Sequence, residues 1–312
     1  MRHLPKITAY GIYLLLFMLP WQTRWIWHEG MLNNGAWEYG TFSLYAWDIV
    51  LILLVLLRVA QQQRVTERMN KKLWVPLAVL FFFAFASVLF SQNREVSWYA
   101  LARLGEGLVL VWLLVTTRWR WAMAAATLVG AGFIQAVIGI YQFFTQAVVS
   151  NKWLGWAVHD PGVLGDFVVE TASGRFLRAY GSFPHPNMLA GFLVVCLLLS
   201  IGFLIQLHPR RKANVVGIVL NVVAFVVMLF ALTLTFSRGG WIGFGVAFLF
   251  LISISIWQGS TVRTRVLMQV AVWIVLLASF SILLLPDVWQ TRLTDPGRLE
   301  QQSTLERTEQ IT

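Results

Sequence analysis

The chain has 312 residues, of which 58% are apolar and only 12% are charged. A water-soluble domain carries about 25% charged and about 45–50% apolar residues, so this composition excludes an ordinary soluble enzyme. The net charge of +10 does not indicate a nucleic-acid-binding protein, because the basic residues lie between apolar runs and form no basic face. Apolar runs of about 20 residues recur along the chain, which predicts an all-α polytopic membrane protein.

Nine transmembrane helices are expected, joined mostly by short loops. The first is preceded by Arg2 and Lys6 but is followed by no small-residue cleavage site, so it is predicted to be a retained helix and not a signal peptide. Together the helices predict a single transmembrane domain over residues 1–285, with an outer loop at 148–186 and the start of a further outer loop at 286–312. The expected spans are 7–21, 43–60, 73–91, 98–117, 121–147, 187–207, 214–236, 241–257 and 266–285.

The distribution of Lys and Arg predicts the orientation of these helices. With the N-terminus in the cytoplasm, the short cytoplasmic segments hold 14 basic residues and one acidic residue, Glu67. The outer segments hold 9 basic and 11 acidic residues. This asymmetry has the direction that the positive-inside rule requires. An odd number of spans then places the C-terminus on the extracytoplasmic side.

Two segments on the predicted outer side combine an arginine with a helix start. Asn187 is expected to cap the sixth span and Ser237 the eighth, because short polar side chains before an apolar run are good N-caps. Arg178 lies nine residues before the first cap, and Arg238 directly follows the second. Helix N-termini and arginines both bind phosphate groups. These features predict one outer anion site shaped for a diphosphate, with Gly239 supporting it.

Each of these features also has a purely structural interpretation. Arg238 can reach the outer lipid headgroups from the end of its span. The segment 185–187, His-Pro-Asn, can be a turn followed by a helix cap. Gly239, Gly243 and Gly245 can form a small-residue face against a neighbouring helix.

Few charged residues lie inside the spans. Arg103 and Glu106 are three residues apart in the fourth span, so they share a helix face and are expected to pair. If they neutralise only one another, Glu106→Gln should destabilise the protein more than Arg103→Leu/Glu106→Leu, which leaves no unpaired charge. His159 and His208 are expected to be solvated loop residues, and no HExxH motif or Cys/His cluster predicts a metal site.

The two outer motifs resemble those of a known family. Arg178-Ala-Tyr-Gly-Ser-Phe-Pro-His-Pro-Asn-Met-Leu-Ala-Gly-Phe-Leu193 is followed some 40 residues later by Thr235-Phe-Ser-Arg-Gly-Gly-Trp-Ile-Gly243. In this order, spacing and topology the pair is similar to the O-antigen ligase and O-antigen polymerase superfamily of bacterial envelope glycosyltransferases. The span pattern is similar over most of the chain, whereas the specific motifs cover about 25 residues.

The resemblance implies an inverting, metal-independent transferase without a cofactor, a multi-pass protein of the bacterial inner membrane that acts in lipopolysaccharide biosynthesis. Its donor would be an undecaprenyl diphosphate-linked glycan and its acceptor a lipid or another glycan, with membrane lipids around it and no nucleic acid. Outer arginines are thought to hold the diphosphate in this family, and the resemblance gives that role to Arg178 and Arg238. The family's functional histidine and closing spans come later, so the sequence is similar to a C-terminally incomplete member, whose activity alone is not expected. Within these residues His185 is a candidate base.

Two other functions remain open. A flippase or exporter of lipid-linked saccharides would also use outer arginines, but it predicts charged or polar residues at mid-membrane depth in several spans. A non-catalytic membrane scaffold explains the apolar spans but does not explain two arginine-bearing outer motifs.

Overall fold

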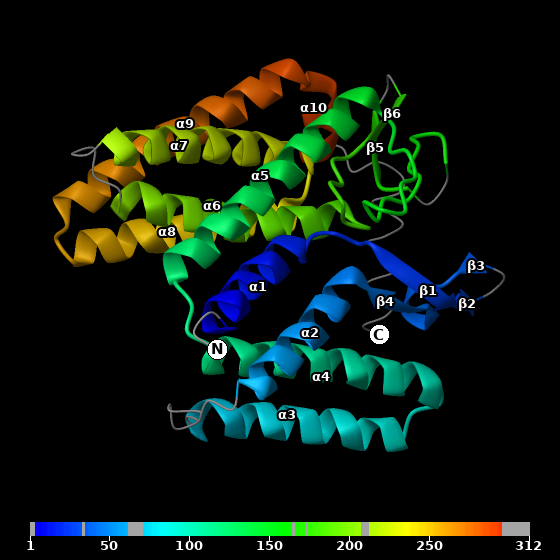
Figure 1. Ribbon diagram of the computed structural model, residues 1–312. Coiled ribbons are helices and arrows are strands. Elements are labelled where there is room, and N and C mark those ends of the chain that lie inside the picture. Colours follow the sequence, from blue (N-terminus) through cyan, green and yellow to red (C-terminus); the bar gives the residue numbers. More distant parts are fainter. Residues whose placement is uncertain are drawn as a thin grey trace. The chain divides into compact units, whose positions relative to one another are not determined.

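The computed structural model describes residues 4–32, 35–61, 71–163, 166–171, 174–206 and 212–294. These residues are mostly helical, and they include seven helices that are long and apolar enough to cross a membrane (Figure 1). The multi-pass helical class predicted from composition is therefore confirmed. The seven helices are α3 (Lys71–Leu89), α4 (Arg94–Thr116), α5 (Trp121–Thr145), α6 (Pro186–Gln206), α7 (Lys212–Leu234), α8 (Arg238–Trp257) and α9 (Thr261–Leu284).

The first two expected spans form shorter helices. α1 (Leu4–Met18) and α2 (Ala46–Ala60) each have 15 residues. A helix rises 1.5 Å per residue, so each is roughly 22 Å long, whereas the hydrocarbon core of a bilayer is about 30 Å thick. The count of nine spans and the placement of the two termini therefore stay predictions.

Contacts divide the chain into two compact units. Unit 1 comprises Met1–Leu19 and Thr23–Ala124. In it α1, α2 and α4 pack around an aliphatic core made by Ile12, Leu15, Leu51, Leu54 and Leu113. α3 packs against α4. This core holds the two short helices of unit 1 in place.

Short antiparallel strand pairs form in two of the connections, and the sequence did not predict them. In unit 1, β1 (Arg24–His28) pairs with β4 (Phe42–Tyr45), and β2 (Met31–Leu32) pairs with β3 (Gly35–Ala36). A 3-10 helix, Glu38–Gly40, precedes β4. In unit 2 the pair is β5 (Val168–Thr171) with β6 (Gly174–Leu177). Strand pairing satisfies backbone groups of these loops without requiring a large core.

Arg103 on α4 is the centre of a charged cluster in unit 1. Its Nη1 donates to Glu106 Oε2 and to Asp48 Oδ2, each over 2.7 Å. The predicted pair with Glu106 is confirmed, but Asp48 at the start of α2 is a second acidic partner that the prediction left out. Asp48 is 1% exposed, and changing Arg103 and Glu106 together would leave it buried without its cation. This reverses the stability order expected for the single and double variants.

Unit 2 comprises Pro20–Gln22 and Ala125–Thr312, and its core gathers around α6. α6 packs against α7, α8 and α9, and a row of its side chains is fully buried, namely Leu189, Ala190, Leu193, Cys196, Leu197 and Ile201. α5 approaches α6 closely at Gly132, where an added Cβ would lie 2.7 Å from Cys196 Sγ. After α9, the short helix α10 (Pro286–Thr294) packs against β5.

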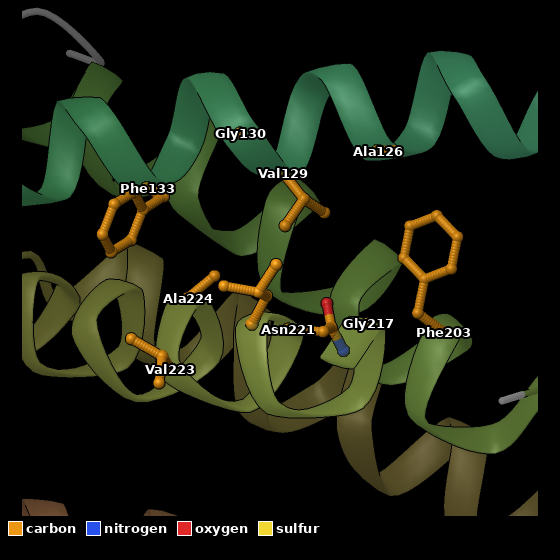
Figure 2. A pocket seen from close by; sticks show the side chains of 10 residues that line it. Ala126, Val129, Gly130, Phe133, Phe203, Gly217, Asn221, Val223 and Ala224 are labelled. Carbon is orange, nitrogen blue, oxygen red and sulfur yellow. The ribbon is translucent and has the colours of Figure 1, made fainter. Parts of the chain in front are cut away.

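An apolar cleft of about 510 Å³ lies between α5, α6 and α7 of unit 2 (Figure 2). Figure 2 shows the amide of Asn221 among side chains that carry only carbon. That amide is already paired, because its Nδ2 donates to the Ser200 carbonyl over 2.9 Å and its Oδ1 accepts from the Ser200 hydroxyl over 3.0 Å. The cleft therefore offers apolar surface and no polar group directed at a ligand.

Candidate functional site

Two glutamines of α5 hold the loop that precedes α6. Gln142 Oε1 accepts from the Gly181 N–H over 2.8 Å, and its Nε2 donates to the Gly181 carbonyl over 2.9 Å. Gln135 Oε1 accepts from the Ser182 N–H over 2.7 Å. Gly181 has φ +63°, and an added Cβ there would lie 2.8 Å from Gln135 Oε1. The loop turn is thus fixed to α5 at a position where glycine is required.

Tyr180 is the fully buried centre of this loop. Its ring stacks on His159 with 4.1 Å between centroids, and its hydroxyl accepts from the Phe167 N–H over 2.7 Å. The Nδ1 of His159 lies 2.6 Å from Asp166 Oδ1. His159 is therefore packed and hydrogen-bonded, and the prediction that it is solvated is wrong. His208 lies outside the described residues.

Arg178 joins the two motifs that the sequence singles out. It is 6% exposed; its Nε donates to the Thr235 carbonyl over 2.6 Å and its Nη2 to Asn187 Oδ1 over 2.7 Å. The next residue, Ala179, donates its N–H to the Leu234 carbonyl over 3.1 Å. Segments that are far apart in the sequence thus meet at one guanidinium group.

The start of α6 differs from the prediction. α6 begins at Pro186, so Asn187 lies in the first turn and is not its cap. His185 takes the capping position: its Nδ1 accepts from the Asn187 N–H over 2.9 Å, and its carbonyl accepts from the Met188 N–H over 3.0 Å. These two amides, which were expected to face an anion, are used within the protein.

His185 is neutral at physiological pH. Burial and, secondarily, the positive charge of Arg178 lower the pKa of His185 to about 4. Because Nδ1 accepts a backbone hydrogen bond, the neutral ring carries its proton on Nε2 and is a donor there. A general base needs an available lone pair. The geometry thus favours a capping role for His185 over the predicted role as base.

The start of α8 agrees with the prediction. Ser237 is its N-cap, and the hydroxyl accepts from the Gly240 N–H over 3.3 Å. Arg238 is exposed at the first helical position. An added Cβ at Gly239 would meet nothing within 4 Å. An added Cβ at Gly240 would lie 2.8 Å from the Ala190 Cβ, so the first turns of α6 and α8 touch.

α10 packs over the turn that leads into α8. Trp289 stacks on Trp241 with 4.8 Å between centroids and meets Phe236 edge-on at 5.6 Å. Phe236 has φ +47°, a left-handed conformation that is rare for a bulky residue, and it is fully buried. The sequence predicted only a loop start over 286–312 and missed this contact.

The assembled site has the chemistry of an anion-binding surface. It combines a buried guanidinium at Arg178, an exposed one at Arg238 and the positive end of the α8 dipole next to Gly239. Such groups stabilise negative charge that develops on a leaving group. In the described part of the chain, no group of three or more His, Cys, Asp or Glu side chains is placed to hold a metal ion.

No family model, no curated protein and no solved structure matches the chain.

Proposed function

We propose that this chain is a membrane glycosyltransferase of the O-antigen ligase or polymerase type. It takes glycan from an undecaprenyl diphosphate donor at the outer face of the bacterial inner membrane and transfers it to a lipid or glycan acceptor. The observation that carries the proposal is the bridge made by Arg178, whose guanidinium bonds Thr235 of one motif and Asn187 of the other. A purely structural turn at each motif does not require the two to meet around a buried cation.

The reaction requires mainly that the protein stabilise the negative charge of the departing diphosphate. The acceptor oxygen attacks the anomeric carbon, the bond from that carbon to the diphosphate breaks, and the electron pair leaves with the diphosphate. Inversion follows from attack on the opposite face. Arg178, Arg238 and the N-terminus of α8 stabilise the departing charge. A separate base takes the acceptor proton, and His185 does not supply it because its Nδ1 lone pair is already used.

Arg238 is the better residue for a first test, because it is exposed and its removal leaves the buried contacts of Arg178 intact. Arg238→Ala should lower both undecaprenyl diphosphate binding and glycan transfer, by about 100-fold in rate for a lost electrostatic donor. Arg238→Lys should recover part of this, because lysine keeps the charge but loses the bidentate fork. Binding is measured with the purified protein in liposomes, and transfer in membranes of the source organism.

Arg263→Ala is the matched control. Arg263 is also an exposed arginine of unit 2, but it lies at the α8–α9 turn, where it donates to Gln258. The Arg263→Ala variant should bind undecaprenyl diphosphate and transfer glycan as the wild type does. Equal binding and transfer by the Arg238→Ala variant and the wild-type protein would contradict the proposal and leave membrane-surface snorkelling as the role of Arg238.

One observation favours the alternative of a transporter of lipid-linked saccharides. The cluster of Arg103, Asp48 and Glu106 places charged groups inside unit 1, as transporters require of their spans. A transporter moves the donor across the bilayer without breaking the bond to the diphosphate. Donor movement in liposomes without any glycan transfer in cells would select this alternative.

A further inference from the structure

A second cleft, of about 450 Å³, lies in unit 1 between α1 and the link that joins α4 to α5. All of its lining residues belong to unit 1, whereas the two arginine-bearing motifs belong to unit 2. Pockets of this size accommodate small-molecule ligands. The residues that line it are Lys6, Ala9, Tyr10, Tyr13, Arg118, Trp119, Arg120 and Met123.

One face of α1 forms the first wall of this cleft. Its lining residues are Lys6, Ala9, Tyr10 and Tyr13, and this spacing of three, four and seven places them on one side of a helix. The rings of Tyr10 and Tyr13 meet edge-on with 6.1 Å between centroids. The wall therefore carries a cation at its first turn and aromatic surface along the two turns that follow.

The α4–α5 link forms the opposite wall and is fixed in place. The Arg120 N–H donates to the Tyr13 hydroxyl over 2.8 Å, which ties the link to α1. The Trp119 indole donates to the Leu114 carbonyl over 2.7 Å, which ties the link to the end of α4. Both walls are thus held without a ligand, so the cleft is already formed before anything binds.

The positive charge of the cleft is not neutralised within the described part of the chain. Lys6, Arg118 and Arg120 are exposed, and among the described residues their side chains have no acidic partner and no hydrogen-bond acceptor. The Tyr13 hydroxyl accepts from the link and retains its own proton as a donor. Arginines that are free to form two parallel hydrogen bonds are suited to phosphate oxygens.

The rest of the lining favours an amphiphilic ligand over a free anion. Ala9, Trp119 and Met123 add apolar surface beside the cations, and apolar surface gains from contact with a hydrocarbon chain. The Lys and Arg distribution predicts that segments 1–6 and 118–120 lie on the cytoplasmic side. Basic pockets between helices on that side are suited to the headgroups of anionic lipids.

We propose that this cleft binds an anionic phospholipid of the cytoplasmic leaflet. Arg118 and Arg120 hold the phosphate group, Lys6 adds positive charge, and the apolar wall contacts the start of the acyl chains. The bound lipid joins α1 to the α4–α5 link and thereby stabilises unit 1. This site does not depend on the proposed transfer reaction, and its ligand is not the glycan donor.

A second arginine pair of the same spacing provides the matched control. Arg263 and Arg265 are exposed at the start of α9, on the same predicted side, and are also separated by one residue. The two double variants, Arg118→Gln/Arg120→Gln and Arg263→Gln/Arg265→Gln, therefore remove the same charge from the protein. Only the first removes it from the cleft.

The experiment measures binding of fluorescent phosphatidylglycerol to the purified full chain in detergent, with phosphatidylcholine and glycerol phosphate as competitors. Arg118→Gln/Arg120→Gln should weaken binding by about tenfold to thirtyfold, the combined loss of two basic residues at an anionic lipid. Arg263→Gln/Arg265→Gln should bind as the wild type does. Arg118→Lys/Arg120→Lys should lose less than the glutamine variant, because lysine keeps the charge without the bidentate fork.

A second pair of variants tests the shape of the cleft without removing a charge. Ala9→Phe narrows the cleft and should weaken phosphatidylglycerol binding by about threefold to tenfold, because the first methylene groups lose their contacts. Leu14→Phe places the same ring at an exposed position of α1 outside the cleft lining and should leave binding unchanged. Phosphatidylglycerol should also raise the thermal unfolding midpoint of the wild type more than that of either cleft variant.

Three results would overturn the assignment. Equal weakening by the two arginine double variants would mean that lipid is attracted by the overall charge and not by the cleft. Phosphatidylcholine that competes as well as unlabelled phosphatidylglycerol would mean that the protein does not select anionic headgroups. Displacement of the lipid by an equal concentration of glycerol phosphate would identify a soluble phosphate compound, and not a phospholipid, as the ligand.

Discussion

Arg178 and Asn187 are joined by a hydrogen bond of 2.7 Å from Nη2 to Oδ1. The same guanidinium donates through Nε to the carbonyl of Thr235. Arg178 is buried, so its charge is held between the first turn of α6 and the turn that leads into α8. This one side chain thus has two tasks, keeping the two motifs together and adding positive charge to the site.

Substitutions at Asn187 separate those two tasks. Asn187→Leu removes an acceptor from a buried cation and should cost about 1–3 kcal/mol of stability. Asn187→Asp keeps the acceptor and adds a negative charge, so it should preserve the thermal unfolding midpoint while weakening diphosphate binding. Thermal unfolding in detergent and diphosphate binding are measured on the same preparations. An Asn187→Asp variant that binds diphosphate like the wild type would show that the charge of Arg178 does not act on the ligand.

Among the residues of α5, Gln142 should be the one whose substitution lowers stability most. Gln142→Leu leaves the N–H and the carbonyl of Gly181 without partners in a buried turn, at about 1–3 kcal/mol for each group. We expect a lower unfolding midpoint and faster proteolysis in the loop before α6. Val137→Leu, at an exposed position of the same helix, is the control and should change neither. Unaltered proteolysis of the Gln142→Leu variant would mean that α5 does not hold the loop.

Substitutions in the charged cluster of unit 1 should destabilise the protein in a defined order. Arg103→Leu leaves Asp48 and Glu106 without their cation and should be the most destabilising single change, by about 3–5 kcal/mol where the charge is fully buried. Glu106→Gln should cost about 1 kcal/mol or less, because Arg103 keeps Asp48 and the Glu106 side chain is 30% exposed. The double variant Arg103→Leu/Glu106→Leu should have a stability close to that of Arg103→Leu. A double variant as stable as the wild type in thermal unfolding would show that Asp48 does not need the arginine.

The sequence predicts those parts of the site that depend on local pattern. Ser237 precedes an apolar run and caps it, as short polar residues do. Arg103 and Glu106 pair because a spacing of three places them on one helix face. α6 and α8 start at the same side because consecutive helices alternate in direction, which allows Arg178 to reach both.

The parts that were missed depend on contacts between distant segments. His159 and Asp166 meet only because the loop folds around Tyr180, and Trp289 reaches Trp241 only once α10 turns back over α8. Gln142 does carry a signal in the sequence, since a glutamine in a largely apolar span needs a polar partner. His185 and Asn187 both precede the apolar run, and only the observed helix start shows which of them caps it.

The stability of the α6 start should depend on pH through His185. The pKa of His185 falls from 6.5 to about 4 in the folded protein, through burial and the nearby charge of Arg178. Between these values the unfolded chain binds a proton that the folded protein does not, so stability is full above pH 6.5 and is lost as pH falls toward 4. At about 1.4 kcal/mol per pKa unit the loss is at most about 3 kcal/mol, and solvent at this half-buried site reduces it.

His185→Asn isolates this contribution, because asparagine is a good N-cap that does not titrate. The difference in unfolding free energy between the wild type and His185→Asn should be constant above pH 7 and should shift in favour of the variant as the pH falls from 6.5 to 4. The carboxylates titrate in both proteins, so their contribution to the unfolding free energy cancels in the difference. A difference that does not change over this range would show that His185 is protonated as easily in the folded protein as in the unfolded chain. The Nδ1 acceptor role at the Asn187 N–H would then be wrong, and His185 would again be available as the base of the transfer reaction.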